Sequence, residues 1–379
     1  MSLRIPLSSP DITEAEIEAV TAVLRTNSLS LGPKLEEFEE AISAFHQVPH
    51  AIAVSSGTAG LHLAIRALSI GEGDEVIIPS FTFIAVANAV RYEHATPVFV
   101  DIDPVTLNMK PACVEAAITP RTRAMIVVHT FGVPAQMDAL MQIAHHHNLA
   151  VIEDACEAIG ATYNDRRVGC FADISVFAFY PNKQITTGEG GAVLVRDAQL
   201  ASRIRALRNQ GRYPSGDWLQ HAEIGYNYRL SEMACALGLV QLNRLPTILA
   251  QRAVVARHYD NSLAQINGIH RPPLHLPSRN ISWFVYVVQL AERFTMVDRD
   301  KVLNSLLNQG IGCARYFAPI HLQPAYAGDP SAQQAKLPVT EAVAQRTLAL
   351  PFFNRLSIAE QTEVAHALDS AVRTIADGS

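Results

Sequence analysis

An alternation of short apolar runs with helical stretches, beginning at Ala51, constrains the fold of this chain more than any other feature. Strands that are buried on both faces of a sheet are almost continuously apolar, so this pattern indicates a mostly parallel sheet covered by helices. The expected fold class is therefore α/β. The apolar runs occupy residues 51–54, 75–78, 97–100, 125–128, 150–153, 173–179 and 191–195.

The segments that flank this alternation have a different pattern. An N-terminal helix is expected to open at Thr13, where Glu16 stands at capping-box spacing, and a second helix follows Pro33. With 379 residues the chain exceeds the usual size of one hydrophobic core. We therefore expect a large domain at 1–245 and a smaller α+β domain at 246–379. In the smaller domain helices are expected around 251–260, 298–307 and from 357, and a strand at 283–290.

Charge and leader patterns exclude several classes of function. The 30 basic and 36 acidic residues give a net charge of −6, which offers no field to hold DNA or RNA. The first ten residues lack the apolar core of a signal peptide, and the apolar stretch from Val76 to Val90 is broken by Pro79 and polar residues. We expect a cytoplasmic protein that binds neither nucleic acid nor membrane.

No metal site or disulfide framework is expected. The cysteines are Cys113, Cys156, Cys170, Cys235 and Cys313, an odd number without C-x-x-C spacing, so they are interpreted as small core residues. The adjacent residues 145–147 are all histidine, but neighbours on a helix point in different directions and cannot share one ion. Trp218 and Trp283 are expected to pack in the protein rather than to bind a sugar.

Residues directly after the strands are the first candidates for a site, because ligands of open parallel sheets bind beyond the carboxyl ends of the strands. The sequence S-S-G-T-A-G at 55–60 follows a strand and leads into a helix. Such a turn offers free N–H groups and a favourable dipole to a phosphate. A plain helix N-cap with flexible glycines explains the turn equally well.

Two further strand ends carry one ionisable residue each. Asp154 ends the run A-V-I-E-D, where its carboxylate needs either a structural cation or a protonated ring nitrogen of a cofactor. Lys183 lies in a charge-poor loop before T-T-G-E-G-G, where a desolvated amine is suited to Schiff-base chemistry, although a surface-loop lysine is commoner. Phe83 offers an aromatic face to a ring, or else packs in the core.

With these residues the sequence resembles the DegT/StrS-type nucleotide-sugar aminotransferases, a family of fold type I pyridoxal-phosphate enzymes. The resemblance covers nearly the whole chain, and the lysine motif with its T-T-G-E-G-G tail is its most specific part. It implies a large domain with a seven-stranded, mostly parallel sheet. The matching segments are 56–64, 73–83, 153–161, 182–191, 225–232 and 319–324.

The resemblance also implies a role for individual residues. Lys183 would be the catalytic Schiff-base lysine, Asp154 the partner of the pyridine nitrogen and Phe83 the stacking ring. The phosphate would be held by Gly57, Thr58 and Ala59, together with Asn227 reaching across from the neighbouring subunit of a homodimer.

Two positions depart from the pattern of the family. A serine that binds the phosphate in many members is replaced by Ala178, so that water or another hydroxyl would supply this hydrogen bond. Glu157 stands where glutamine or histidine often lies near the phenolic oxygen of the cofactor. A glutamate there would repel a phenolate unless it is protonated or turned away. Glutamate at this position is similar to the GDP-perosamine synthase branch, which aminates carbon four of its sugar.

The predicted activity is transfer of an amino group from L-glutamate to a nucleotide-linked keto sugar, with pyridoxamine phosphate as the intermediate form of the cofactor. The alternatives are a pyridoxal-phosphate aminotransferase or lyase acting on a cyclitol or other keto substrate, and a cofactor-binding regulator without turnover. Candidate substrate contacts are Tyr316 and His321, which would otherwise pack the domain junction. Arg229 and Arg315 are candidates for the pyrophosphate, although arginines more often pair with carboxylates or stay solvated.

Overall fold

The computed structural model of this chain describes residues 3–213, 217 and 219–377. Its centre is a seven-stranded sheet in the order β1-β9-β8-β5-β4-β2-β3. Strand β9 is antiparallel to both its neighbours, and the five strands from β8 to β3 are parallel. All the predicted strands, and the mostly parallel α/β sheet, are confirmed. The strands are β1 (His50–Val54), β2 (Glu75–Pro79), β3 (Thr96–Val100), β4 (Thr122–Val128), β5 (Ala150–Asp154), β8 (Ile174–Ala178) and β9 (Gly191–Val195).

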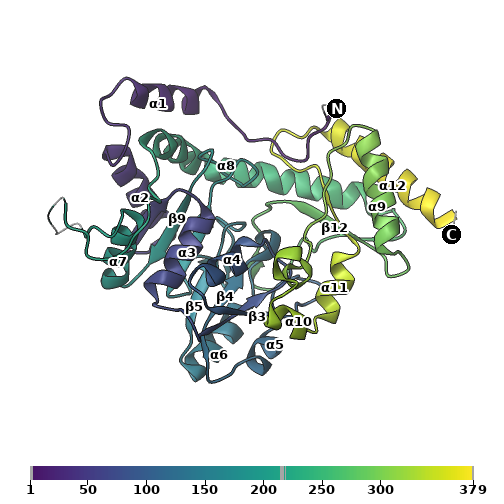
Figure 1. Cartoon of the computed structure of the whole chain (residues 1–379). Helices are drawn as coiled ribbons and strands as arrows, with labels where there is room; N and C mark the ends of the chain where they lie inside the picture. The colour runs from purple at the N-terminus through teal and green to yellow at the C-terminus, as the bar shows by residue number, and fades with distance from the viewer. Residues whose placement is uncertain (1–2, 214–216, 218, 378–379) are drawn as a thin grey trace.

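Helices cover both faces of this sheet (Figure 1). In the N-terminal two thirds of the chain they are α1 (Glu14–Leu24), α2 (Pro33–His46), α3 (Gly57–Ala67), α4 (Ala85–Tyr92), α5 (Pro111–Ala116), η1 (Thr130–Gly132), α6 (Met137–His147), α7 (Ala198–Arg208) and α8 (Glu232–Ser262). The capping box of Thr13 and Glu16 at the start of α1 is confirmed, and so is Pro33 at the start of α2.

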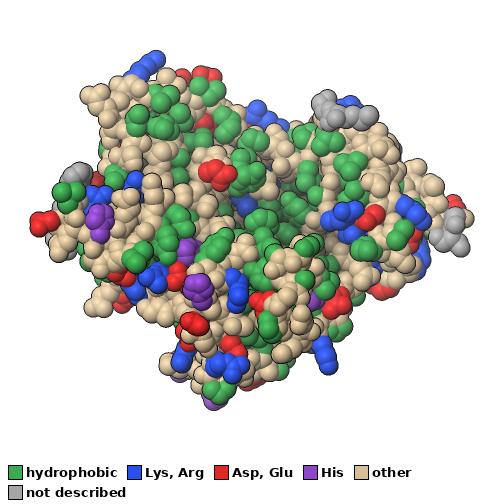
Figure 2. Space-filling view, in the orientation of Figure 1, with side chains coloured by type: hydrophobic (Ala, Val, Ile, Leu, Met, Phe, Trp, Pro, Cys, Tyr) green, Lys and Arg blue, Asp and Glu red, His purple; other side chains and the backbone are tan. Residues whose placement is uncertain are grey.

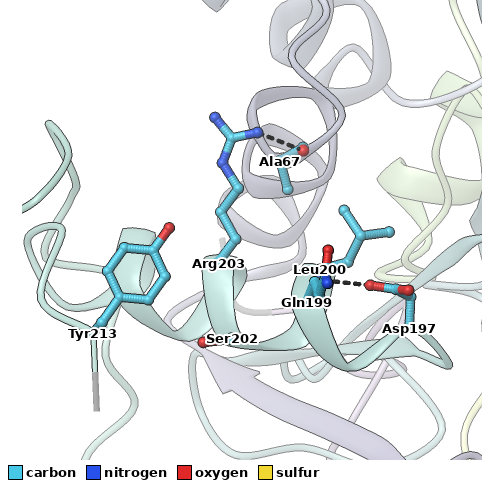
Figure 3. A pocket seen from close by; sticks show the side chains of 7 residues that line it. All are labelled: Ala67, Asp197, Gln199, Leu200, Ser202, Arg203 and Tyr213. Atoms are coloured by element: carbon cyan, nitrogen blue, oxygen red, sulfur yellow. Dashed lines mark hydrogen bonds between the residues drawn. The ribbon is translucent and has the colours of Figure 1, made fainter. Parts of the chain in front are cut away.

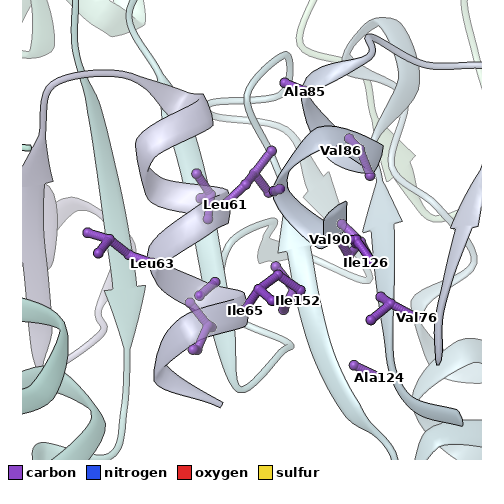
Figure 4. Close-up of a cluster of buried hydrophobic side chains, with 14 of the residues drawn as sticks. Leu61, Leu63, Ile65, Val76, Ala85, Val86, Val90, Ala124, Ile126 and Ile152 are labelled. Carbon is purple, nitrogen blue, oxygen red and sulfur yellow. The ribbon is translucent and has the colours of Figure 1, made fainter. Parts of the chain in front are cut away.

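The apolar alternation of each strand decides which helices it meets. Ile126 faces the layer that α3 and α4 fill with Leu61 and Val90, as Figure 4 shows. Its neighbour Val127 faces the opposite layer, with side chains of α6. Successive residues of a strand point to opposite faces, so a run of apolar residues buries both surfaces of the sheet.

The C-terminal region has its own sheet and its own apolar cluster. Strands β10 (Ile269–His270), β12 (Tyr286–Leu290) and β13 (Thr347–Leu350) pair antiparallel, and a third small sheet joins β6 (Thr162–Tyr163), β7 (Arg166–Arg167) and β11 (Arg279–Asn280). Trp283 is buried in the C-terminal cluster, as expected, whereas Trp218 lies outside the described residues. The helices here are α9 (Met296–Asn308), η2 (Ile320–Leu322), η3 (Pro324–Tyr326), α10 (Pro330–Gln334), α11 (Pro338–Ala344) and α12 (Ile358–Asp377).

Helix α8 connects the two regions and contains the predicted boundary at residue 245. In Figure 1 it runs across the molecule from α2 to the C-terminal helices. The N-terminal segment follows the same path, and Ile5 packs in the C-terminal cluster while its carbonyl accepts from Gly312 N. The division into 1–245 and 246–379 therefore remains a prediction. Helix α8 is long and apolar enough to span a membrane, yet Leu245, Ile248 and Tyr259 are wholly buried in the core, as in a core helix.

Candidate active site

The sheet topology brings three of the predicted site segments to one edge. Strand β1 has the same direction as β5 and β8, because two antiparallel pairings separate β1 from β8. The turn at Ser55, the end of β5 at Asp154 and the loop that follows β8 therefore lie at the carboxyl ends of these strands. Lys183 lies in that loop, between β8 and β9.

The turn after β1 is shaped to accept a ligand at the start of α3. Ser56 is the N-cap, and its Oγ accepts a hydrogen bond of 3.0 Å from Ala59 N. The N–H groups of Gly57 and Thr58 belong to the first residues of the helix and have no acceptor within it. A Cβ on Gly57 would lie 2.7 Å from Ala178 Cβ and 3.0 Å from Cys156 Sγ. Glycine thus lets the start of α3 pack directly on Ala178 and Cys156, and the free N–H donors beside it form a cradle that fits a phosphate group.

Lys183 is held in a partly buried environment beside one carboxylate and one aromatic ring. Its Nζ lies 3.4 Å from Glu157 Oε1 and 4.0 Å from the centroid of the Phe284 ring. The side chain of Lys183 is 14% exposed and that of Glu157 is 10% exposed. Lys183 is therefore not the surface-loop lysine of the alternative interpretation.

Asp154 and Cys156 come just before Glu157 in the chain and belong to the same group of side chains. Asp154 is buried, and its Oδ1 accepts a hydrogen bond of 3.0 Å from Cys156 N. Burial raises the pKa of the Cys156 thiol well above its usual value, Asp154 and Glu157 raise it further, and Lys183 opposes them. The thiol also borders the cradle at Gly57, so Cys156 joins the phosphate turn to the charged groups.

Glu157 is not turned away from the site. Its Oε2 accepts a hydrogen bond of 2.9 Å from Phe131 N, while Oε1 faces Lys183. Burial raises the pKa of Glu157, and the charge of Lys183 lowers it by less. The carboxyl therefore takes up a proton more readily than an exposed glutamate, which is the property that a neighbouring phenolate oxygen requires.

Several aromatic residues come from segments near the site, and they differ in burial. Phe83 is 61% exposed, in contrast to the fully buried Phe81, so the alternative of a core phenylalanine is wrong. The ring of Phe131 stacks on those of Tyr316 and Phe317, with centroids 6.2 and 5.2 Å away. Burial and the nearby Glu157 raise the pKa of Tyr316, which places that candidate residue close to the site.

The other candidate residues have different surroundings. His321 is buried, with Nδ1 2.7 Å from Ser80 Oγ and Nε2 3.4 Å from Glu341 Oε1, as the domain-junction alternative describes. Arg315 is exposed and pairs with Asp300 at 2.9 Å. Arg229 donates to Asn209 Oδ1 at 2.9 Å. Asn227 is exposed on the same segment as Arg229.

Sequence reasoning missed three contributors to this site. Cys156 was assigned to the core, and Phe131 and Phe284 were not singled out. The only signal for Cys156 was its position two residues after Asp154. The two phenylalanines carried no local signal, because they come from η1 and from the segment just before β12, far from Lys183 in the chain.

The surface has several hollows, and not all of them are lined by the predicted site residues. Figure 2 shows a recess lined by hydrophobic side chains between the two regions of the molecule. A hollow of about 420 Å³ opens at the start of α3 and includes Ser55, Ser56, Thr58 and Ala59. Another, of about 460 Å³, lies beside α7, where Arg203 donates to the Ala67 carbonyl (Figure 3). None of the predicted site residues lines this second hollow.

Known proteins match the chain over almost its full length. The model of the DegT/DnrJ/EryC1/StrS aminotransferase family matches residues 10–369. A GDP-perosamine synthase from Caulobacter vibrioides is 41% identical over 371 residues, covering 97% of this chain and 98% of that protein. The spore coat polysaccharide biosynthesis protein SpsC of Bacillus subtilis is 38% identical over 379 residues, covering 97% of each.

A solved structure matches the fold closely. The protein Spr1654 from Streptococcus pneumoniae, in its PMP-form, superposes with a TM-score of 0.93 at 28% identity and covers 98% of both chains. Its PLP-form superposes with a TM-score of 0.92. Two forms of the same cofactor are thus recorded in a protein of this architecture.

Proposed function

Because the chain belongs to the DegT/DnrJ/EryC1/StrS aminotransferase family, we propose that it transfers the amino group of L-glutamate to a nucleotide-linked keto-deoxy sugar. The chain is a pyridoxal-phosphate-dependent aminotransferase of fold type I, and the sequence-based expectations of family, fold class and cofactor are confirmed. The product would be an amino sugar nucleotide for glycan or secondary-metabolite biosynthesis.

One observation carries the proposal: Asp154 accepts a hydrogen bond from Cys156 N, Cys156 Sγ borders the helix N-terminus at Gly57, and the amine of Lys183 lies beside Glu157, the residue after Cys156. Pyridoxal phosphate has an aldehyde, a basic ring nitrogen and a phosphate, which need one partner each. Gly57, Thr58 and Ala59 would hold the phosphate, and Phe83 would stack on the ring. When bound, the cofactor supplies the carbonyl that takes up the amino group and a ring that withdraws electrons.

The side chains of the protein would bind this group and move protons around it. Lys183 Nζ would carry the cofactor and, once displaced by the amino donor, would take a proton from the donor carbon and return it to the cofactor carbon. The carboxylate of Asp154 would keep the ring nitrogen protonated. Glu157 would share a proton with the phenolic oxygen, in agreement with its raised pKa.

Two observations support a sugar nucleotide as acceptor. A relative named GDP-perosamine synthase is 41% identical to this chain over nearly its whole length. The glutamate at position 157 is similar to that branch, which favours the 4-keto over the 3-keto sugar. Tyr316, Arg229, Arg315 and His321 remain the candidate contacts of the substrate, and the burial of His321 makes it the least accessible of them.

A homodimer with a shared active site belongs to the same proposal. Asn227 is exposed, and the next residue holds the phosphate turn of its own subunit, because Tyr228 O accepts from Ser55 N at 2.9 Å. Across a two-fold axis the same surface patch meets itself. An axis passing close to this turn would bring Asn227 of each subunit to the phosphate of the other.

We place the enzyme in the cytoplasm. All five cysteines are free thiols, including the partly buried Cys156 of the site. Reducing compartments keep such thiols intact. Fractionation of cells, followed by detection of the protein, tests this assignment.

A two-step spectroscopic experiment tests the activity. The purified protein is loaded with pyridoxal phosphate and incubated with L-glutamate, and we expect its absorbance to change to that of the pyridoxamine form. This form is then mixed with keto sugars that carry different nucleotides, and the matching one should restore the first spectrum. A spectrum unchanged by glutamate would indicate a regulator, and recovery only with a cyclitol would indicate the other alternative.

The variant Asp154→Asn tests the role of the ring partner. We expect it to bind cofactor but to lose most of the glutamate half-reaction, by a factor on the order of 100 or more. Asp173→Asn is the matched control, because Asp173, like Asp154, accepts a hydrogen bond from a backbone N–H, that of Val151 at the opposite edge of the sheet. Equal rates for wild type and Asp154→Asn would contradict the assignment.

A further inference from the structure

A hydrogen-bonded network of side chains lies behind the phosphate turn. His62, on α3, is buried, and its Nδ1 lies 3.0 Å from Tyr228 Oη while its Nε2 lies 2.8 Å from Glu93 Oε1. Glu93, just after α4, also accepts hydrogen bonds of 3.0 Å from Tyr226 Oη and from Arg66 Nη1. The network therefore joins α3, the end of α4 and the segment 226–228.

The direction of each hydrogen bond follows from the charge of Glu93. Burial opposes ionisation of Glu93, but the hydrogen bonds from His62 and Tyr226 and the charge of Arg66 lower its pKa overall. Glu93 is thus a carboxylate that only accepts, so His62 Nε2 donates to it. With that tautomer His62 Nδ1 is free to accept the hydroxyl hydrogen of Tyr228, 3.0 Å away. Each hydroxyl has a fixed partner, which fixes the tyrosine rings as well.

The two tyrosines determine where Asn227 points. Their rings stack with centroids 4.9 Å apart and an interplanar angle of 9°. Alternate residues of an extended segment point to the same side, so Asn227, between them, points to the other. The backbone is also held, since Tyr226 N donates to Leu207 O at 2.7 Å and Tyr228 N donates to Arg208 O at 3.0 Å.

The same segment also supports the phosphate turn of its own subunit. Ser55 N donates to Tyr228 O at 2.9 Å, directly before the N-cap Ser56. His62 belongs to the helix whose first N–H groups face the cradle. The hollow of about 420 Å³ contains both parts, with Ser55 and Thr58 on its wall beside His62, Tyr226 and Tyr228.

We infer that His62, Glu93, Tyr226 and Tyr228 are positioning residues that fix the phosphate turn of their own subunit and, at the same time, aim Asn227 at the cofactor phosphate of the partner. This inference rests on the homodimer of the proposed function. Its consequence is that the affinity of one active site for the phosphate group depends on the network in the other subunit.

The first experiment compares Tyr228→Phe with Tyr92→Phe. The first variant keeps the stacked ring and loses only the hydroxyl bound to His62, while Tyr92 lines the same hollow and serves as the control. Affinities are measured for pyridoxal phosphate and for pyridoxal, which lacks the phosphate. We expect Tyr228→Phe to lower the affinity for pyridoxal phosphate about fivefold. The affinity for pyridoxal should not change. A general structural defect would lower the affinities for the two ligands equally. Equal affinities of Tyr228→Phe and Tyr92→Phe for pyridoxal phosphate would overturn the inference.

The second experiment uses mixed dimers of two differently tagged chains. One chain is wild type, and the other carries Lys183→Ala, so that only the wild-type chain can bond the aldehyde covalently. Adding Tyr228→Phe to the Lys183→Ala chain should lower the affinity of the wild-type site for pyridoxal phosphate about threefold to fivefold. When that chain also carries Asn227→Ala, Tyr228→Phe should have no further effect, because both changes act through one contact.

The outcomes separate this inference from the proposed function. Wild-type protein that neither dimerises nor responds to glutamate would refute the proposed function itself. A wild-type dimer that is active, combined with the absence of any effect of Tyr228→Phe on the opposite site, would refute only the positioning role.

Discussion

Two buried glutamates at the end of one strand differ in what surrounds them. Glu153 lies on β5, and its carboxylate accepts from His129 Nε2 at 2.9 Å, from the backbone of Gly169 and Phe171, and from Ser175 Oγ. Glu157 lies three residues beyond the strand, with one backbone donor and the more distant Lys183 ammonium.

The pKa values of these two carboxyls move in opposite directions despite similar burial. Burial raises the pKa of both groups, but at Glu153 the hydrogen bonds from His129 and from the backbone of Gly169 and Phe171 outweigh it and the pKa falls. At Glu157 the donors are too few, and the pKa rises. A fully satisfied buried charge stabilises the fold, while an incompletely satisfied pair remains available to a ligand.

The comparison predicts that Lys183→Ala abolishes function without loss of stability. Turnover should fall by about 1,000-fold or more, since the covalent attachment and the proton carrier are lost together. The free energy of unfolding without cofactor should change by only about 1 kcal/mol, because Glu157, whose pKa is already raised, can take up a proton when the ammonium is removed. Lys301→Ala is the control, because Lys301 lies at a similar distance, 3.3 Å, from Asp298 on the surface of α9. Strong destabilisation by Lys183→Ala would show that the surroundings of Glu157 stabilise the fold as those of Glu153 do.

For Glu153→Ala we expect the reverse result. The buried His129, two backbone N–H groups and Ser175 lose their acceptor, so the free energy of unfolding should fall by about 3–5 kcal/mol. Denaturant unfolding of the cofactor-free protein measures this. A loss no larger than that of Glu157→Ala would show that the number of donors does not decide the role of a buried carboxylate.

His46 extends the comparison to pH, because it packs near Glu153. Burial lowers the pKa of His46 to about 3, from an ordinary value of about 6.5. Below about pH 6.5 His46 therefore binds a proton in the unfolded chain but stays neutral in the native protein. Stability should fall by about 2 kcal/mol between pH 7 and pH 5 through this residue.

The variant His46→Phe should lose that part of the acid dependence, which is measured by denaturant unfolding at several pH values. The exposed His145, replaced by phenylalanine, serves as the control and should leave the slope unchanged. Identical pH dependence in wild type and His46→Phe would contradict the assignment of a neutral buried imidazole.

The smallest expected effect concerns Glu157→Gln. Negative charge beside Nζ favours the protonated form of the covalently loaded lysine. Removing it should lower the pH at which the visible absorbance of the loaded protein titrates, by about 0.5–1 unit. An unchanged titration would indicate that Glu157 is already neutral in the loaded protein.

The sequence determined the elements and the chemistry at their ends. The apolar runs predicted every strand of the large sheet, since burial on both faces requires such runs. The same pattern placed Ser55, Asp154 and Lys183 after strands, and parallel strands bring such positions to one edge. The capping residues Thr13 and Glu16 were also predictable from the sequence, because their partners lie within one turn.

Only the tertiary structure decided which side chains meet. His62 and Tyr228 lie 166 positions apart in the chain, and Lys183 and Glu157 lie 26 apart. Nothing local distinguishes the exposed Phe83 from the buried Phe81, or shows that His321 lies against Ser80. Local patterns follow from the periodicity of strands and helices, whereas contacts between distant segments depend on the order of the strands within the sheet.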